Sequence, residues 1–352
     1  MWLTTGLVVV LIAGLLVAHR CLRPSASPAP ASAQALPSAT VKPTVLFVDS
    51  YHEGYPWSEG IIQGCCNTFK VLRQPDGSLD CSGSRVNLRL TRMDTKRNGS
   101  EEFKRKAGQK VRDLIEQTRP DLVICADDNS TAYVLARWYK GSKLPFIFCG
   151  VNWDASAYGL PCANVTGMLE VSLIDDMLEL MGRYAKGRRL GLLGARNESN
   201  QKEAENYTRK LGVSLEEVVF VDDFPQWRRA FLDLQGKLDM LILAPPSFLA
   251  SEADKAEARR FVLENTRIPT GSVEDWIAPY SLVCYAKLAT EQGEWAAQSA
   301  MRVLSGTPPR EIPVVGNRSA AVMLNMPLAR RMGVVFPVDT IQQAVLVGDA
   351  ER

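Results

Sequence analysis

The feature that most constrains this chain is a repeated alternation of short apolar runs with charged segments of helical periodicity. Runs such as DLVICADD (residues 121–128) and LPFIFCGVN (residues 144–152) are apolar almost throughout. Strands of this kind are buried on both faces, which is typical of a parallel sheet covered by helices. The alternation therefore predicts an α/β fold.

The alternation is interrupted once, at the irregular stretch 153–165, and then restarts. We expect strands over residues 45–49, 86–92, 121–128 and 144–152 before the break, and over 189–195, 217–223, 239–246 and 268–273 after it. We expect helices over residues 58–72, 100–118, 129–139, 173–184, 199–211, 225–234, 253–265 and 291–304. A chain of 352 residues is long enough for two domains. Two doubly wound parallel-sheet lobes are the expected architecture.

The N-terminus resembles a targeting segment. The run GLVVVLIAGLLVA (residues 6–18) is shorter than the roughly 20 apolar residues that span a bilayer. We therefore expect residues 1–23 to be a signal peptide or an N-terminal membrane anchor. Cleavage after residues 31–33 and lipid attachment at Cys21 both stay open. Residues 24–43 are rich in Pro, Ala and Ser and predict a spacer, so the folded body is expected to be periplasmic or extracytoplasmic, free or anchored to the inner membrane.

The cysteine count, the balance of charges and the motifs limit the classes of function that this chain could have. The sequence has eight cysteines, and in an exported protein Cys81 could pair with Cys65 or Cys66. Lys plus Arg number 41 against 39 Asp plus Glu, mixed along the chain, which argues against nucleic acid as a partner. Two histidines cannot build a His-rich metal site, and no phosphate loop, dinucleotide fingerprint or nucleophile elbow follows a predicted strand. We expect no metal, no cofactor and no catalytic residue, hence no enzyme.

Polar and aromatic residues follow the predicted strands. Ligands of open parallel sheets bind outside the carboxyl ends of the strands, and a mixture of rings, amides and acids suits a small polar molecule. The expected ligand-binding residues are Ser50, Tyr51, Tyr55, Trp57, Asp127, Asp128, Asn129, Asn152, Trp153, Arg196, Glu274 and Asp275.

Several of these residues have a structural alternative. Tyr55 and Trp57 could staple the helix that follows them, and Asp128 could be a helix N-cap. Glu274 and Asp275 could be solvated turn residues. If these two carboxylates line the site, they favour a ligand with an ammonium or guanidinium group.

Four stretches resemble a known family. VDSYHEGYPWSEGIIQG (residues 48–64), NVTGM (164–168), GTPPREIPV (306–314) and LNMPLARRMGVVFP (324–337) are similar to ABC transporter substrate-binding proteins of the tryptophan and tyrosine importer-like type. The same stretches are similar to extracellular sensing regions of bacterial histidine kinases and diguanylate cyclases. The resemblance covers about residues 44–345.

The resemblance implies a type I periplasmic-binding fold, in which three crossovers join two lobes. Residues 44–155 with 280–312 would form lobe I, and residues 156–279 with 313–347 would form lobe II. Closure on an amino acid, an amine or another small polar ligand would precede delivery to an ABC permease and its ATPase. In the alternative, the chain is a stand-alone sensory module that reports to a partner kinase or cyclase. Members that import aromatic amino acids carry small turn residues where this chain has ADDNS (126–130) and VEDW (273–276), so the ligand is not carried over.

Overall fold

The computed structural model describes residues 41–348. The expected signal or anchor segment, Cys21 and nearly all of the expected spacer lie outside these residues. Residues 42–348 belong to one compact unit. That unit contains two large sheets and a small hairpin made of β2 (Leu72–Arg73) and β3 (Leu79–Asp80).

The first sheet has six strands in the order β13-β7-β6-β5-β1-β4, and every pairing is parallel. Its strands are β1 (Thr44–Asp49), β4 (Asn87–Arg92), β5 (Leu122–Ala126), β6 (Phe146–Asn152), β7 (Val165–Glu170) and β13 (Val315–Gly316). Because they all run the same way, their carboxyl ends share one edge of the sheet.

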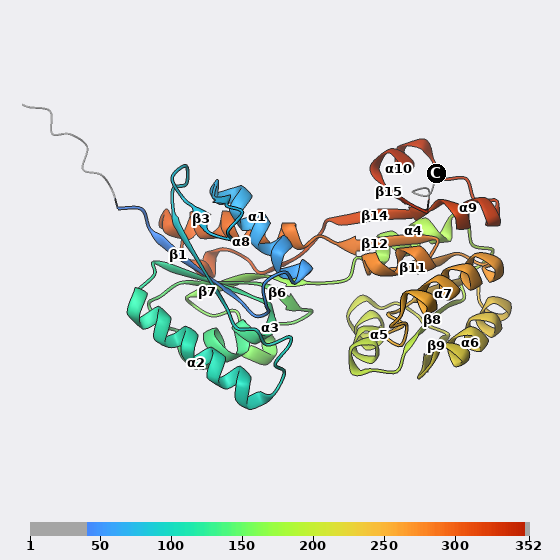
Figure 1. Ribbon diagram of the computed structural model, residues 1–352, viewed down its shortest axis with the longest axis horizontal. Coiled ribbons are helices and arrows are strands. Elements are labelled where there is room, and N and C mark those ends of the chain that lie inside the picture. Colours follow the sequence, from blue (N-terminus) through green and yellow to red (C-terminus); the bar gives the residue numbers. More distant parts are fainter. Residues whose placement is uncertain (1–40, 349–352) are drawn as a thin grey trace, which may run out of the picture. The chain divides into compact units, whose positions relative to one another are not determined.

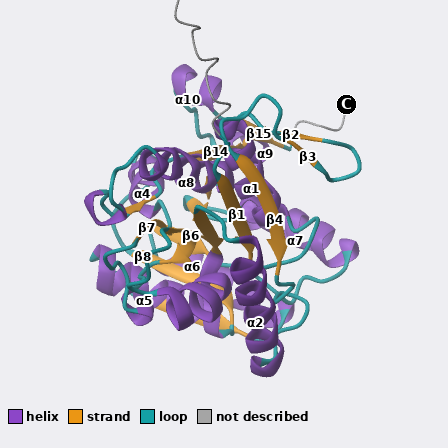
Figure 2. Cartoon of the chain, turned by 90° about the vertical axis from the view of Figure 1, so that its left-hand side faces the viewer, coloured by secondary structure: helices purple, strands orange, loops and turns teal. Residues whose placement is uncertain are grey.

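Helices cover both faces of this sheet (Figures 1 and 2). They are α1 (Pro56–Phe69) and α8 (Ala289–Leu304) on one face, and α2 (Glu101–Thr118), α3 (Asp127–Ser130) and the π-helix η1 (Thr131–Tyr139) on the other. Strand β1 serves both faces, since Val45 and Phe47 pack with α1 and α8, whereas Leu46 and Val48 pack with α2 and η1. This is the alternation that a strand buried on two sides requires.

The second sheet has seven strands in the order β15-β14-β12-β11-β10-β8-β9. Its strands are β8 (Leu190–Ala195), β9 (Glu217–Val221), β10 (Met240–Leu243), β11 (Thr270–Ser272), β12 (Val283–Lys287), β14 (Ala320–Asn325) and β15 (Val345–Val347). From β9 to β12 the pairings are parallel, as the sequence predicts. Strand β14, over which no strand was predicted, is antiparallel to β12, so this end of the otherwise parallel sheet is mixed.

Seven helices belong with the second sheet in the described part of the chain. They are α4 (Ile174–Gly182), α5 (Glu198–Leu211), α6 (Phe224–Lys237), α7 (Glu252–Asn265), the 3-10 helix η3 (Asp275–Tyr280), α9 (Met326–Met332) and α10 (Val338–Gln343). Trp227 and Phe231 of α6 stack with ring centroids 5.0 Å apart, and Phe261 of α7 packs edge-on against both. These rings anchor α6 and α7 in the core beside β8 and β10.

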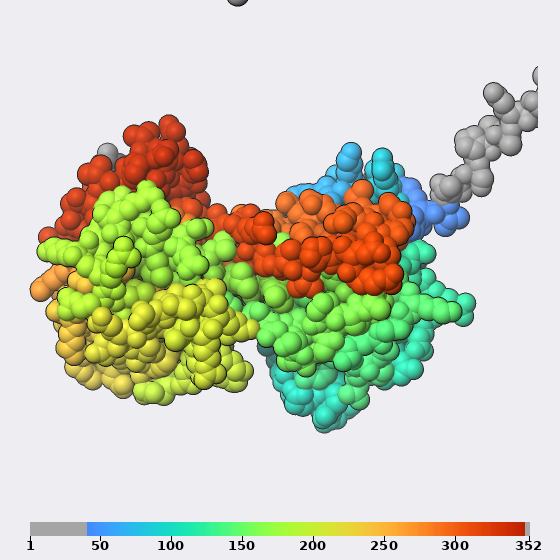
Figure 3. Space-filling model, turned by 180° about the vertical axis from the view of Figure 1, so that it is seen from behind, coloured from blue at the N-terminus to red at the C-terminus, as the bar shows by residue number. Residues whose placement is uncertain are grey.

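The chain passes between the two sheets after β7, after β12 and between β13 and β14. Three strands lie on the other side of the expected lobe boundaries, among them β13, which pairs with β7 in the first sheet although residues 313–347 were expected in lobe II. Strand β7 pairs with β6 in the first sheet, where Gly167 leaves room for the ring of Phe148: a Cβ on Gly167 would lie 2.3 Å from that ring. Strand β12 pairs with β11 in the second sheet. Seen from behind, α8 (orange) lies on the first-sheet side, whereas the red residues of β14 and beyond lie with the second (Figure 3).

The expected disulfide is not formed. All seven cysteines within residues 41–348 are free thiols. Cys65 is turned toward α8, where its Sγ lies 3.2 Å from the carbonyl oxygen of Gly293, and Cys81 accepts a hydrogen bond from the backbone of Leu88 at 3.4 Å. Cys66, the other partner expected for Cys81, is buried as a free thiol in the core of the first sheet. None of the helices in the described residues combines the length and the apolarity that crossing a membrane requires.

Candidate functional site

The carboxyl edge of the first sheet gathers most of the expected site residues. In the register of the sheet, Asp49 is opposite Ala126, which in turn is opposite Cys149, and Asn152 is opposite Glu170. The loops that leave β1, β5, β6 and β7 therefore start at neighbouring points of one edge. Tyr51, Asp127 and Trp153 follow these strand ends.

Three strained residues mark this edge. Five non-glycine residues within residues 41–348 have a positive φ, and Lys70 and Arg119 among them simply end helices. The other three are Asp94, Asp127 and Trp153, which follow β4, β5 and β6. A left-handed backbone at such residues costs about 1 kcal/mol or more and persists where the surroundings hold it, commonly at functional sites.

Asp127 is the most unusual group at this edge. Its side chain is only 1 % exposed. Oδ1 accepts a hydrogen bond of 2.9 Å from Nε1 of Trp57, whereas Oδ2 is buried without a hydrogen-bond partner among residues 41–348. Burial, and then the charges of Glu170 and Asp49, raise the pKa of Asp127 well above the ordinary aspartate value.

Tyrosine rings form a wall beside Asp127. Tyr51 and Tyr55 meet edge to face with centroids 5.0 Å apart. The ammonium of Lys96 lies 5.1 Å from the Tyr51 centroid and 5.2 Å from the Tyr55 centroid. Burial, and then the charges of Asp127 and Asp128, raise the pKa of the Tyr51 hydroxyl. The two rings thus already contact a cation next to a pair of carboxylates.

The hydrogen bonds of Asp128, Asn129 and Tyr55 bear on whether these residues have the structural roles that the sequence offered as alternatives. Asp128 does not cap its helix: it accepts hydrogen bonds of 2.7 Å from Asn152 Nδ2 and from the Tyr158 hydroxyl. Asn129 donates to Thr95 Oγ1 at 2.8 Å. Tyr55 occupies the N-cap position of α1 without a side-chain capping bond, and Pro56 opens the helix.

Ser50 serves the backbone. It is fully buried, and its hydroxyl donates to the carbonyl of Ala126 at 2.5 Å and accepts from the backbone N–H of Ser130 at 2.8 Å. These two bonds tie the end of β1 to the start of α3. Ser50 therefore holds the edge together, and its hydroxyl has little capacity left for a ligand.

Sequence reasoning missed three charged residues that connect the two sheets. Lys287, the last residue of β12, lies 2.8 Å from Oε1 of Glu170 on β7 and 3.4 Å from Oε1 of Glu274. Burial alone would lower the pKa of Lys287, but the Glu170 and Glu274 carboxylates raise it. Glu203 of α5 accepts a hydrogen bond of 2.7 Å from Nε1 of Trp153 and another from the Ser172 hydroxyl.

Two expected residues are not brought to this group. The guanidinium of Arg196 lies 3.2 Å from Asp222 and donates to the carbonyl of Phe220 at the end of β9. Asp275 is exposed and accepts a hydrogen bond from the backbone of Trp276 at 2.7 Å. Trp153 and Glu274, in contrast, reach the group through Glu203 and Lys287.

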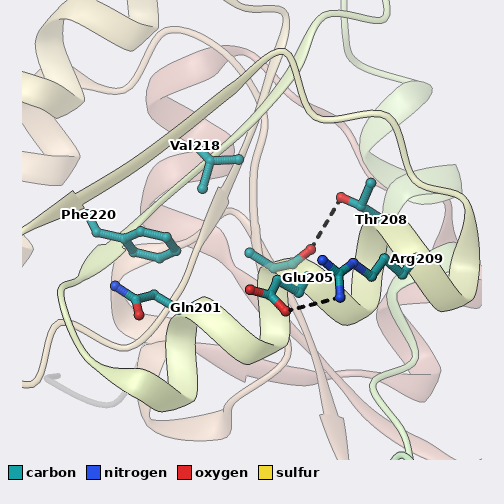
Figure 4. A pocket seen from close by; sticks show the side chains of 7 residues that line it. Gln201, Glu205, Thr208, Arg209, Val218 and Phe220 are labelled. Carbon is teal, nitrogen blue, oxygen red and sulfur yellow. Dashed lines mark hydrogen bonds and ion pairs between the residues drawn. The ribbon is translucent and has the colours of Figure 1, made fainter.

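A surface hollow of about 450 Å³ lies elsewhere on the second sheet (Figure 4). It is lined by Gln201, Ala204, Glu205, Thr208, Arg209, Val218 and Phe220. Its charged side chains pair with each other, since Arg209 lies 3.7 Å from Glu205. This hollow sits between α5 and the edge strand β9 and contains none of the strand-end residues, so the candidate site is the group of side chains rather than this hollow.

Comparisons with known proteins give a family and a fold. Residues 90–348 match the family described as ABC transporter substrate binding protein. A comparison with curated protein sequences found no match.

Solved structures resemble the chain over most of its length at low identity. The ligand-free, open structure of CD0873, a substrate binding protein with adhesive properties from Clostridium difficile, has a TM-score of 0.65 at 17% identity and covers 87% of this chain and 99% of its own. An ABC domain in complex with L-Trp from Streptococcus pneumonia has a TM-score of 0.55 at 16% identity, with the same coverage of 87% and 99%. A conserved domain protein from Vibrio cholerae has a TM-score of 0.53 at 14% identity, again covering 87% and 99%.

Proposed function

Because the chain belongs to the ABC transporter substrate-binding protein family, we propose that it is an extracytoplasmic solute-binding protein that holds a small polar ligand between two lobes and delivers it to an ABC permease. Lobe I is built on the first sheet and lobe II on the second. The type I periplasmic-binding fold of the solved relatives supports this architecture.

The observation that carries the proposal is the group of side chains at the carboxyl edge of the first sheet. Trp57 and Asp127 are hydrogen-bonded there, the Tyr51 and Tyr55 rings stand beside them, and one buried carboxylate oxygen has no partner within the described residues. A buried acceptor without a partner is costly, and a bound ligand that donates to it would remove that cost.

Contacts between the sheets support a hinge mechanism. Trp153 of lobe I is bonded to Glu203 of lobe II, and Asp154 lies 3.2 Å from Lys210 of α5. A ligand that touches residues of both lobes stabilises the state in which they are close, and so shifts the equilibrium between open and closed forms. The closed form is the one that a permease would recognise.

A thermal-shift screen tests the proposal. Purified residues 42–352 are heated with amino acids, amines, nucleosides, sugars and short peptides, and a ligand at 100 times its dissociation constant should stabilise the fold by about 2.7 kcal/mol. The substitution Trp57→Ala should abolish the shift, because it removes both the ring and the donor to Asp127.

The control is Trp138→Ala, which removes another half-buried tryptophan, one that packs on Arg112 and Arg137. This variant should keep the ligand-induced shift. A binder that protects Trp57→Ala as well as the parent protein would contradict the placement of the site. A chain that responds to no compound in any class would contradict the proposed function.

A further inference from the structure

The candidate site contains an excess of negative charge. Five carboxylates belong to it: Asp127, Asp128, Glu170, Glu203 and Glu274. Within the described residues, Lys287 is the one basic side chain within ion-pair distance of any of them. Carboxylates gathered in a partly buried place repel each other, so a positive charge placed among them is favourable.

A second observation points to a missing partner for this charge. Asp127 is only 1 % exposed, and its Oδ2 has no hydrogen-bond donor among residues 41–348. Glu170 and Asp128 are among the charges that act on it, so it lies inside the acidic group. A donor that carries a positive charge would satisfy this oxygen best, because charge-assisted hydrogen bonds are the stronger kind.

The aromatic wall suits the same chemistry. The ammonium of Lys96 already lies about equally far from the Tyr51 and Tyr55 centroids, at 5.1 and 5.2 Å. Tyrosine faces attract organic cations, whereas a metal ion is held by oxygen, nitrogen or sulfur ligands. Rings and carboxylates side by side therefore favour an ammonium or a guanidinium group.

Apart from the exposed Lys96, whose ammonium lies over the Tyr51 and Tyr55 rings, the cations near the site are already paired with carboxylates of the protein. Lys287 is engaged by Glu170 and Glu274, and Arg92 lies 3.4 Å from Asp49 and 3.1 Å from Glu59. A ligand carboxylate that bound at Lys287 or Arg92 would have to displace a carboxylate of the protein.

We propose that the ligand is an organic cation with a net positive charge, such as an aliphatic amine or guanidine, an inference that rests on the proposed function. Asp127 is the residue that pairs with the charged group of this ligand. The Tyr51 and Tyr55 rings would cover the adjoining carbon atoms. Glu203 and Glu274 would attract the remainder of the ligand from the side of the second sheet.

Titration calorimetry with four probes tests this charge preference. The probes are 1,4-diaminobutane and agmatine as cations, and L-tryptophan and L-glutamate as ligands with no net positive charge. We expect the cations to bind at least tenfold more tightly than the other two. If L-tryptophan or L-glutamate binds and neither cation does, the proposed function stands and the proposal of a cationic ligand is overturned. If none of the four probes binds while the broad screen finds a neutral or acidic ligand, the proposal of a cationic ligand is likewise overturned.

Substitutions locate the charge. Asp127→Asn keeps the shape of the side chain and an oxygen for Trp57, and it should weaken binding of the cationic probe at least tenfold. The matched control Glu257→Gln removes an exposed carboxylate paired with Arg228 on the second sheet, and it should bind as the parent does. Equal affinities for the parent and Asp127→Asn would overturn the assigned role of Asp127.

A pH series gives an independent readout. Asp49, Asp128 and Glu170 face Asp127 together with the neutral groups of Tyr51 and Cys149; burial, and then the charges of Glu170, Asp49 and Asp128, raise the pKa of Asp127, although the hydrogen bond from Trp57 opposes this. A cation binds the ionised carboxylate, so affinity should increase as the pH rises from about 4, the ordinary aspartate value, through the raised pKa of Asp127. The Asp127→Asn variant should show a flatter profile. Identical profiles for the two proteins would contradict the pairing.

Discussion

Asp127 and Gly150 fit each other closely. Both have a φ of 69°, and a Cβ on Gly150 would lie 2.9 Å from Oδ1 of Asp127. The backbone N–H of Gly150 also donates to Oε1 of Gln292 on α8 at 2.8 Å. Glycine at position 150 therefore leaves the space in which the Asp127 carboxylate is held against Trp57.

Gly150→Ala should consequently disturb both the fold and the site. A left-handed φ already disfavours alanine by about 1 kcal/mol, and the contact with Asp127 adds a cost of similar size. Gly141→Ala is the matched control, since Gly141 has a φ of 72° and nothing within 4 Å of its added Cβ. Urea unfolding should show a larger loss for Gly150→Ala than for Gly141→Ala. Equal losses would mean that the carboxylate simply moves away.

At this scale the sequence predicted some charged residues of the site and missed others in both sheets. Asp127 and Asp128 were identifiable because two acids exceed what one helix cap needs. Glu170, Glu203 and Lys287 were missed because their roles arise from contacts between distant elements. Glu170 does follow the short apolar run VTGML, and Lys287 follows VCYA, so both positions carry the signal of a strand end.

Among the elements, α1 and α8 approach each other unusually closely. A Cβ on Gly293 would lie 1.9 Å from the carbonyl oxygen of Ile61, and a Cβ on Gly64 would lie 2.1 Å from that of Thr290. The backbones of the two helices are thus in contact at these glycines. Neither helix periodicity nor charge predicts this contact. The predicted bounds of α8 were nearly right, and the family resemblance implied its return to the first lobe, but the sequence did not show that α1 is its partner.

Gly293→Ala should be strongly destabilising. The added methyl meets backbone atoms that cannot rotate away, so the free energy of unfolding should fall by about 3 kcal/mol, near the upper range for overpacking. In contrast, Gly236→Ala in α6 meets nothing within 4 Å and should raise the free energy of unfolding by up to about 1 kcal/mol through helix propensity. Thermal or urea unfolding measures both, and a neutral Gly293→Ala would show that the helices separate easily.

Most strands were predictable because burial on two faces leaves a continuous apolar run. Strand β14, with the sequence AAVMLN, is antiparallel, and no local pattern distinguishes its direction from that of its neighbours. The same limit applies to the sheet to which β7 and β12 belong. Pairing across long stretches of chain decides these points, and it is not visible in local periodicity.

For the whole molecule, the ion pair of Lys287 with Glu170 is a link between the two sheets. Both side chains are 12 % exposed, and each stands at the end of a strand where the chain crosses over. Burial raises the pKa of Glu170 even though Lys287 opposes this effect. The pair therefore exists against a desolvation cost and depends on both partners being present.

Lys287→Met should leave Glu170 buried without its cation and lower the free energy of unfolding by about 3–5 kcal/mol. Adding Glu170→Gln to the same chain should restore much of the loss, because no buried charge is then stranded. Lys237→Met, which breaks an exposed pair with Asp233, should change stability very little. A double variant no better than Lys287→Met would show that the methionine, not the lone carboxylate, causes the loss.

Helix α8 closes the face of the first sheet from a position more than two hundred residues after β1. During synthesis, the face of α1 that contains Gly64 therefore stays uncovered until α8 has left the ribosome. A nascent chain that stops before Ala289 should therefore stay protease-sensitive in its N-terminal half.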